Sequence, residues 1–236
     1  MTLNISVLGG FALVDDLGGP YAAASVSSRR LLAFLALRPR ENLRIAVAGA
    51  MWPDVTEHKA ALSLRATLAR MDARSRELVT VASTSLGLAA NVEVDLRSSH
   101  ALALRLLPRE VLPNVADINP AAVAALSVEL LPDWYDDWVL AAAEDWRGLR
   151  MNGLEAQTRL LVAAGRLPEA GVAARAAISV EPLRESAQAA LIRVHIAEGN
   201  QSEALRVFDR YSVLLNGSLG LAPTTQLSTL VRDITR

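Results

Sequence analysis

The sequence predicts an α+β winged helix-turn-helix domain over residues 1–97, followed by an all-α tetratricopeptide-like helical repeat domain over residues 98–236. Three observations predict this arrangement. The first third of the chain alternates short extended runs with three helical patterns and closes with two further extended runs. The rest is helical almost throughout, and residue types recur in it 34 positions apart. With 236 residues, of which 52% are hydrophobic, the chain can bury two cores.

The opening of the chain is predicted to form short strands and two helices. Strands are expected over residues 3–8, 11–14 and, from a weaker pattern, 22–26, and helices over residues 29–37 and 44–51. Ser27 or Ser28 is a suitable N-cap for the first helix, because a short side-chain oxygen can accept from a free backbone N–H. Pro39 ends that helix.

Residues 57–76 are predicted to form a third helix with two distinct faces. An apolar stripe recurs at helical spacing along one face: Ala61, Leu64, Leu68 and Met71. About half a turn away lies a stripe of cations and hydroxyls: Lys59, Ser63, Thr67, Arg70 and Arg74. Long cations neutralise phosphates and short hydroxyls approach base edges, so this stripe suits a helix in a major groove. A solvated outer face is the alternative, because amphipathic helices often expose arginine.

Two extended runs, residues 78–83 and 88–94, follow the third helix and are joined by turn residues 84–87, which predicts a hairpin. Strands, three helices and a hairpin in this order outline a winged helix-turn-helix. In that fold the third helix enters the major groove and the hairpin lies over the neighbouring backbone. The charge distribution agrees, since residues 56–76 carry a net charge of +3 in a chain whose net charge is −1.

The predicted DNA contacts fall into three groups. Base edges are assigned to Ser63, Thr67 and Arg70 of the third helix. Phosphates are assigned to Lys59, Arg65, Arg74 and Arg76. The backbone contacts of the hairpin are assigned to Ser83, Thr84 and Ser85.

Helical repeats are predicted for the second domain, after a helix over residues 97–107 and a proline-containing connection over residues 108–120. Three residue pairs lie 34 positions apart, the period of a tetratricopeptide repeat: Gly165 and Gly199, Ala170 and Ala204, Ala177 and Tyr211. Residues 129–146 hold six acidic and no basic side chains, so this stretch is expected to repel a duplex.

The sequence contains no catalytic or cofactor-binding pattern, so neither an enzyme nor a bound cofactor or metal is predicted. His58, His100 and His195 lie far apart and lack partners at metal-ligand spacing. Lys59 is the only lysine and no glycine-rich run precedes it, which argues against a Walker-type phosphate loop. The absence of cysteine fits a reducing compartment. No run has the pattern of a signal peptide or membrane span, so a cytoplasmic protein without membrane contact is expected.

Four aromatic residues cluster before and within the first long helix of the second domain: Trp134, Tyr135, Trp138 and Trp146. They fit two interpretations, a ligand cage or apolar packing. We expect packing, because the same helix otherwise offers only small apolar residues over positions 141–143.

Several motifs are similar to those of one family. In the first domain they are Leu8-Gly9-Gly10-Phe11, the run from Ser28 to Leu37, Met51-Trp52-Pro53-Asp54 and the run from Val92 to Leu96; in the second they are the runs from Leu130 to Val139, Glu181 to Ser186 and Leu219 to Pro223. On these residues the chain resembles the Streptomyces antibiotic regulatory proteins, transcriptional activators that join an OmpR-type winged helix to a bacterial transcriptional activator domain. It departs from the family pattern at Asp72, Met51 and Leu88, where the family usually has arginine, leucine and an aromatic residue.

The resemblance implies an activator that binds direct repeats upstream of a promoter, with one copy on each repeat, and that recruits RNA polymerase. Double-stranded DNA, the polymerase and a second copy on DNA are then the expected partners. It also implies a polymerase contact at the loop that holds Trp52, Asp54 and Glu57. Acidic residues beside a DNA-reading helix repel phosphate, which favours a protein contact there. Trp52 has a second interpretation, as an anchor for this loop.

The low charge of the first domain, +2 over residues 1–97, leaves a second function open. The chain could be a helical-repeat interaction module whose winged helix has lost useful DNA affinity. Two copies side by side would offset the low charge, because each adds its own phosphate contacts. Binding to a fragment of its own upstream region at moderate salt discriminates the two functions.

Overall fold

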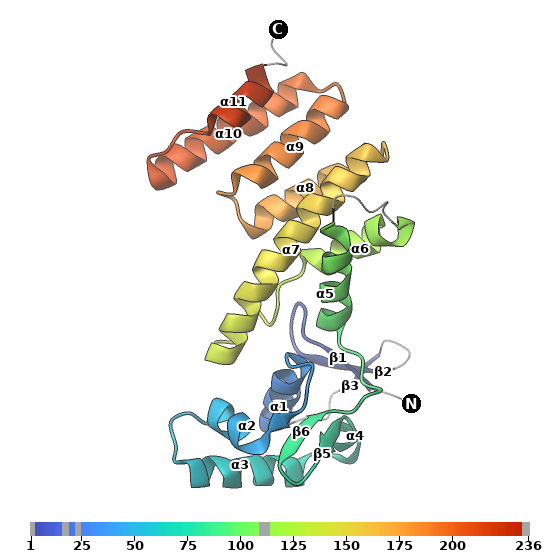
Figure 1. The fold of residues 1–236 in the computed structure, drawn as a ribbon, viewed down its shortest axis with the longest axis vertical. Helices are drawn as coiled ribbons and strands as arrows, with labels where there is room; N and C mark the ends of the chain where they lie inside the picture. The colour runs from blue at the N-terminus through green and yellow to red at the C-terminus, as the bar shows by residue number, and fades with distance from the viewer. Residues whose placement is uncertain (1–2, 16–18, 22–24, 109–113, 233–236) are drawn as a thin grey trace. The chain divides into compact units, whose positions relative to one another are not determined.

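A computed structural model describes residues 3–15, 19–21, 25–108 and 114–232 of the chain. They form two compact units (Figure 1). The first unit joins the described residues up to 98 with residues 129–145, and the second joins residues 99–128 with residues 146–236 as far as they are described. The predicted boundary near residue 97 did not anticipate that residues 129–145 associate with the first unit.

Two small antiparallel sheets belong to the first unit. The first has the order β1 (Leu3–Ser6), β2 (Ala12–Asp15), β3 (Pro20–Tyr21), and the second has the order β4 (Asn42–Leu43), β6 (Ser85–Leu88), β5 (Val79–Val81). Two predictions are corrected here. Residues 25 and 26 begin a helix rather than continue a strand over 22–26, and residues 22–24 lie outside the described residues. The hairpin turn lies at residues 82–84, because residues 85–88 pair as a strand.

Residues 26–77 form four helices where three were predicted. They are α1 (Val26–Ala36), α2 (Arg44–Met51), α3 (Glu57–Arg70) and α4 (Ala73–Glu77). Ser25, rather than Ser27 or Ser28, caps α1, since its hydroxyl accepts from the N–H of Ser28 at 3.2 Å. The apolar face of α1 is fully buried, as Leu31, Leu32 and Leu35 show no exposed surface.

The predicted single helix over 57–76 is wrong, because the chain turns out of helical geometry at Met71 (ψ 136°). Asp72 then caps a separate short helix, α4, by accepting from the N–H of Ser75 at 3.0 Å. An aspartate at an N-cap satisfies an otherwise free N–H, and this local gain outweighs one more turn of continuous helix. Asp72, one of the departures from the family pattern, therefore divides the predicted helix in two.

Residues 129–145 pack against the first unit through backbone bonds, buried leucines and aromatic rings. Gly9 N–H donates to the carbonyl of Glu129 at 2.7 Å, and Leu131 N–H donates to that of Val7 at 3.0 Å. Leu130 and Leu131 are buried. The segment therefore pairs with residues 7–9, which follow β1, and closes part of the core.

An aromatic cluster joins the same segment to α1. Trp138 meets Phe34 edge-on at a centroid distance of 5.2 Å, and Trp134 lies 6.0 Å from Phe11 and 6.3 Å from Trp138. Arg30 of α1 pairs with Asp136, its Nε donating at 3.0 Å. Trp134 and Trp138 thus serve packing, whereas Tyr135 between them is 79% exposed.

The second unit is helical throughout its described residues. Its elements are most of α5 (Asp95–Leu106), a 3-10 turn (Val115–Ile118), α6 (Pro120–Ser127), the part of α7 (Asp137–Ala163) from residue 146, α8 (Leu167–Val180), α9 (Glu185–Ala197), α10 (Gln201–Leu219) and α11 (Thr225–Arg232). Trp146 is buried and donates from its indole to the carbonyl of Val128 at 2.9 Å. Within the described part of the chain, every helix is too short or too polar to cross a membrane.

The predicted 34-residue repeat is confirmed, because its residue pairs occupy equivalent positions in successive helices. Gly165 and Gly199 both have a left-handed backbone (φ +71° and +73°) at the turns before α8 and α10. Ala170 and Ala204 have no exposed surface, which lets neighbouring helices approach closely. Helices α8, α9 and α10 pack in succession (Figure 1).

Candidate nucleic-acid interface

Helix α3 exposes one continuous face in the first unit. His58, Leu62, Arg65 and Ala69 recur along it at helical spacing and are exposed, with Lys59 and Arg70 exposed at its flanks. The opposite face buries Ala60, Leu64 and Leu68. Ala61, predicted to be buried, is only half-buried, and Ala60 takes its place. The outward face therefore carries three cations, Arg65 along it and Lys59 and Arg70 at its flanks, with the exposed Leu62 among them.

Thr67 does not reach that face, which corrects the prediction that it reads base edges. Its side chain is 6% exposed, and its hydroxyl donates to the carbonyl of Ser63 at 2.9 Å. Back-bonding of this kind is common for threonine inside helices. Ser63 itself is half-buried, and its hydroxyl remains at the edge of the exposed face.

Arg74 and Arg76 lie on α4, so the break at Met71 removes them from the stripe that contains Lys59 and Arg70. The guanidinium of Arg74 lies 5.4 Å from the ring centroid of Tyr21. Arg76 donates from Nη1 to the carbonyl of Val79 at 2.9 Å. Both cations are already engaged within the unit, which corrects the prediction of one continuous stripe from 59 to 74.

The Asp72 carboxylate stabilises this corner of the unit. It accepts from Ser75 N–H at 3.0 Å and from the Tyr21 hydroxyl at 3.1 Å. Burial alone would raise the pKa of Asp72, but the hydrogen bonds to its charged form outweigh burial and lower that pKa. Burial, and then the bond to Asp72, raises the pKa of the Tyr21 hydroxyl.

Asp72→Ala is expected to lower the free energy of unfolding by about 1 kcal/mol at pH 7, whereas Asp72→Asn keeps a capping oxygen and loses less. Because the folded-state pKa is depressed, this carboxylate stabilises the fold above its unfolded pKa, and the contribution is lost as the pH falls through the folded value. Urea unfolding at pH 7 and at acidic pH measures both effects. Equal stability of the alanine variant and the native chain at pH 7 would contradict the capping role.

The turn of the hairpin exposes Ser83 and Thr84, as predicted for a backbone contact. Ser85 is less available, because its hydroxyl donates to Oε2 of Glu41 at 2.6 Å. Arg44, at the start of α2, donates from its backbone N–H to the carbonyl of Thr84 at 2.9 Å. This bond holds Arg44 beside the turn of the hairpin, a contact that the sequence pattern did not indicate.

A hollow lies on each side of α3. One, of about 440 Å³, is bordered by α2, α3 and the hairpin. Its cations and hydroxyls are Arg44, Arg65, Ser83 and Thr84, and the acidic Glu57 and several apolar residues also line it. The other, of about 660 Å³, is bordered by the start of α1, Trp52 and α3, and its polar residues are Ser25, Ser27, Ser63, Thr67 and Arg70. Ser25, Ser27 and Arg44 were missed by sequence reasoning. Their positions at the starts of α1 and α2 could have indicated them, since helix N-termini attract anions.

The loop before α3 combines one partly buried aromatic residue with exposed acids. Trp52 is half-buried and borders the second hollow, whereas Asp54 and Glu57 are exposed. Thr56 caps α3 by accepting from the N–H of Lys59 at 3.5 Å. Trp52 therefore fits the anchoring interpretation, and the acidic side chains are free to meet a protein partner.

Two comparisons with known proteins agree with this architecture. A family model described as the bacterial transcriptional activator domain matches residues 94–235. The structure of Mycobacterium tuberculosis EmbR in complex with a low affinity phosphopeptide matches with a TM-score of 0.63 and 22% identity, over 99% of this chain and 65% of that one. At this identity the likeness shows the fold, and the chain spans less than two thirds of that protein. A search of curated proteins gave no match.

Proposed function

Because the chain belongs to the bacterial transcriptional activator domain family, we propose that it is a sequence-specific DNA-binding activator that uses α3 to bind promoter direct repeats and that recruits RNA polymerase. The resemblance to antibiotic regulatory proteins with a winged helix and an activator domain is confirmed at the level of family and fold. The proposed function places the protein in the cytoplasm, where its DNA and polymerase partners reside.

The observation that carries the proposal is the exposed face of α3, with its three cations Lys59, Arg65 and Arg70, and a hollow with cations and hydroxyls on each side. A major groove is about 12 Å wide and admits one helix, with a phosphate backbone along either edge. In the proposed complex α3 lies in the groove, and each hollow receives one backbone. Arg44, Arg65 and the hairpin hydroxyls of Ser83 and Thr84 meet one strand, and the two arginines offset the repulsion of phosphate by Glu57, which also lines this hollow. The start of α1 meets the other, and Arg70, which also lines this second hollow, is left for the bases.

Within this arrangement Arg70 and Ser63 are assigned to base edges, and Lys59 and Arg65 to phosphates. A guanidinium can donate two hydrogen bonds to the O6 and N7 acceptors of guanine, which suits Arg70. Lys59, at the first turn of α3, acts as a point charge and carries no sequence preference. Arg74, Arg76 and Ser85 are assigned weaker contacts, because each already has a partner within the unit.

Recruitment of RNA polymerase is assigned to the loop with Trp52, Asp54 and Glu57. The two acids are exposed beside α3 and repel phosphate, so they favour a protein surface. Two copies on adjacent repeats would double the phosphate contacts of a weakly charged first unit. This is the reason to expect self-association on DNA.

Lys59→Ala and Arg70→Ala separate the two kinds of contact. Lys59→Ala is expected to weaken binding to all sequences alike and to reduce the salt slope by about 1, whereas Arg70→Ala costs about 1–3 kcal/mol and relaxes specificity at one base position. Gel-shift titrations at several salt concentrations, on specific and scrambled duplexes, measure both. An unchanged slope for Lys59→Ala would remove that residue from the phosphate contacts.

The rival function is a helical-repeat interaction module without useful DNA affinity. It is supported by the net charge of only +2 over residues 1–97. Under that function the native chain fails to shift its own upstream region at moderate salt, while it still binds a protein partner. Under the proposed function it shifts that region, and two copies bind together.

A further inference from the structure

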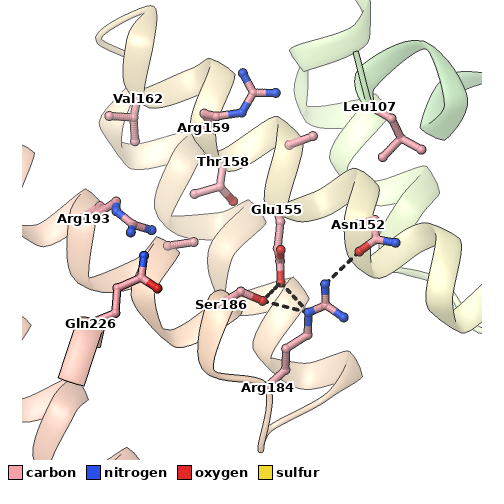
Figure 2. A pocket seen from close by; sticks show the side chains of 12 residues that line it. Leu107, Asn152, Glu155, Thr158, Arg159, Val162, Arg184, Ser186, Arg193 and Gln226 are labelled. Carbon is pink, nitrogen blue, oxygen red and sulfur yellow. Dashed lines mark hydrogen bonds and ion pairs between the residues drawn. The ribbon is translucent and has the colours of Figure 1, made fainter. Parts of the chain in front are cut away.

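A groove of about 770 Å³ runs between helices of the second unit (Figure 2). One face of α7 lines it with Asn152, Glu155 and Arg159, spaced three and four residues apart, and one face of α9 lines it with Ser186 and Arg193. Gln226 of α11 completes one end. None of these residues takes part in the proposed DNA contacts.

A hydrogen-bonded network fixes one side of the groove. Arg184 donates from Nε to Oε1 of Glu155 and to Oγ of Ser186, both at 2.8 Å, and from Nη2 to Oδ1 of Asn152 at 2.8 Å. Ser186 also donates to Glu155 at 2.7 Å. Arg184 thus neutralises Glu155, and the network holds these side chains in place (Figure 2).

Two further arginines of the groove remain uncompensated. Arg159 and Arg193 are both exposed, and among the described residues neither has an ion-pair or hydrogen-bond partner. Figure 2 shows Arg193 next to Gln226, on the side of the groove away from the Arg184 network. Because Glu155 is already paired, the groove presents two free positive charges that come from two different helices.

The lining selects the chemistry of the ligand. Pockets for small organic ligands are mostly lined by apolar and aromatic side chains. This groove has no aromatic residue, and its apolar lining is limited to Leu107, Val162 and two alanines. Guanidinium groups bind carboxylates through paired hydrogen bonds, and Asn152 and Gln226 offer partners for peptide amides. Duplex DNA is too wide to enter a groove between neighbouring helices, whose axes lie about 8–10 Å apart.

We propose that this groove binds an extended acidic peptide segment of a partner protein, with carboxylates paired to Arg159 and Arg193. Clusters of arginine in a preformed groove are one of the recurring modes of acidic-motif recognition. The activator domain then has a docking site of its own, distinct from the DNA face of the first unit.

Fluorescence anisotropy of a labelled hexaglutamate peptide with the full chain tests the proposal at low salt, with hexaglutamine as the matched peptide. The native chain is expected to bind the first peptide and not the second. Arg159→Gln and Arg193→Gln are each expected to weaken binding about tenfold, and the double variant to abolish it. Arg210→Gln on α10 is the control, since this exposed arginine carries the same charge and does not line the groove.

The proposal is overturned if the native chain does not bind hexaglutamate, or if the double variant keeps a native circular dichroism spectrum and binds the peptide as well as the native chain does. It is also overturned if Arg210→Gln weakens binding as much as the groove variants do. A fourth contrary result is displacement of the peptide by free glutamate at equal carboxylate concentration. The last would make the groove a site for small anions instead of a peptide site. Gel shifts with the double variant keep this test separate from the proposed function, because DNA binding is expected to be unchanged. A loss of DNA binding would reassign the two arginines to DNA.

Discussion

Replacing Trp138 with alanine is expected to lower the free energy of unfolding of the first unit by about 2 kcal/mol. The half-buried indole lies against Phe34 of α1 and meets Trp134 at a centroid distance of 6.3 Å, so its removal uncovers apolar surface and ends two aromatic interactions. The residue lies in the segment 129–145, well beyond the predicted domain boundary. A large decrease in stability would show that this segment is part of the folded first unit.

Tyr135→Ala is the matched control, because Tyr135 is an aromatic residue of the same segment that is 79% exposed. Its removal is expected to change the free energy of unfolding by less than about 0.5 kcal/mol. Urea unfolding followed by far-ultraviolet circular dichroism measures both variants without relying on tryptophan fluorescence. Equal effects of the two substitutions would contradict the packing role of Trp138.

The double variant Arg65→Ala/Arg70→Ala is expected to bind a specific duplex at least about 30-fold more weakly, since each arginine of this kind contributes about 1–3 kcal/mol. The two arginines border the hollows on opposite sides of α3. Removal of both therefore takes away one proposed phosphate contact, that of Arg65, and one proposed base contact, that of Arg70. The salt slope is expected to fall by about 0.9 for each phosphate that the variant no longer neutralises.

Arg74→Ala provides the control for that variant. Arg74 is exposed and close in sequence, but it lies on α4 with its guanidinium against Tyr21. Its removal is expected to weaken DNA binding by less than about threefold, below about 1 kcal/mol. Should Arg74→Ala weaken binding as much as the double variant, the DNA surface would have to be extended from α3 to α4.

The sequence predicted the structure best where neighbouring residues determine an element or where a pattern repeats along the chain. The bounds of α2, 44–51, were predicted as observed, because an apolar run ends at a proline-containing stop. The 34-residue repeat placed Gly165 and Gly199 at equivalent turns. Both cases depend on residues close together in the chain or on a period that is visible without coordinates.

It failed where two local patterns competed or where interacting residues are distant in sequence. The apolar stripe reached Met71 and the stripe of cations and hydroxyls reached Arg74, so the N-cap at Asp72 was overlooked and the predicted helix was about one and a half turns too long. Residues 84–87 have turn composition, yet Leu86 is buried and pairs with Asn42 of β4. Long-range pairing overrides local propensity in such strands. The packing of residues 129–145 on residues 7–9 and on α1 joins positions far apart in the chain, and no local pattern indicates it.

For the candidate site, residue type predicted a cationic helix but not the direction of every side chain. Lys59, Ser63 and Thr67 follow one another at steps of four residues. Because an α-helix has about 3.6 residues per turn, each such step rotates the side chain further around the helix, and Thr67 ends on the side of the core. Its hydroxyl then bonds to Ser63 inside the helix. Arg44 joins the site only because β4 and the hairpin bring α2 beside Thr84.

The most direct test of the central claim is selection of duplexes from a random-sequence pool by the full chain, followed by footprinting of the enriched sequence. The account predicts enrichment of a direct repeat, with one protected major-groove segment in each repeat and no enrichment by the Arg65→Ala/Arg70→Ala variant. Failure of the native chain to enrich any sequence, or enrichment of the same sequence by the double variant, would contradict DNA recognition through α3.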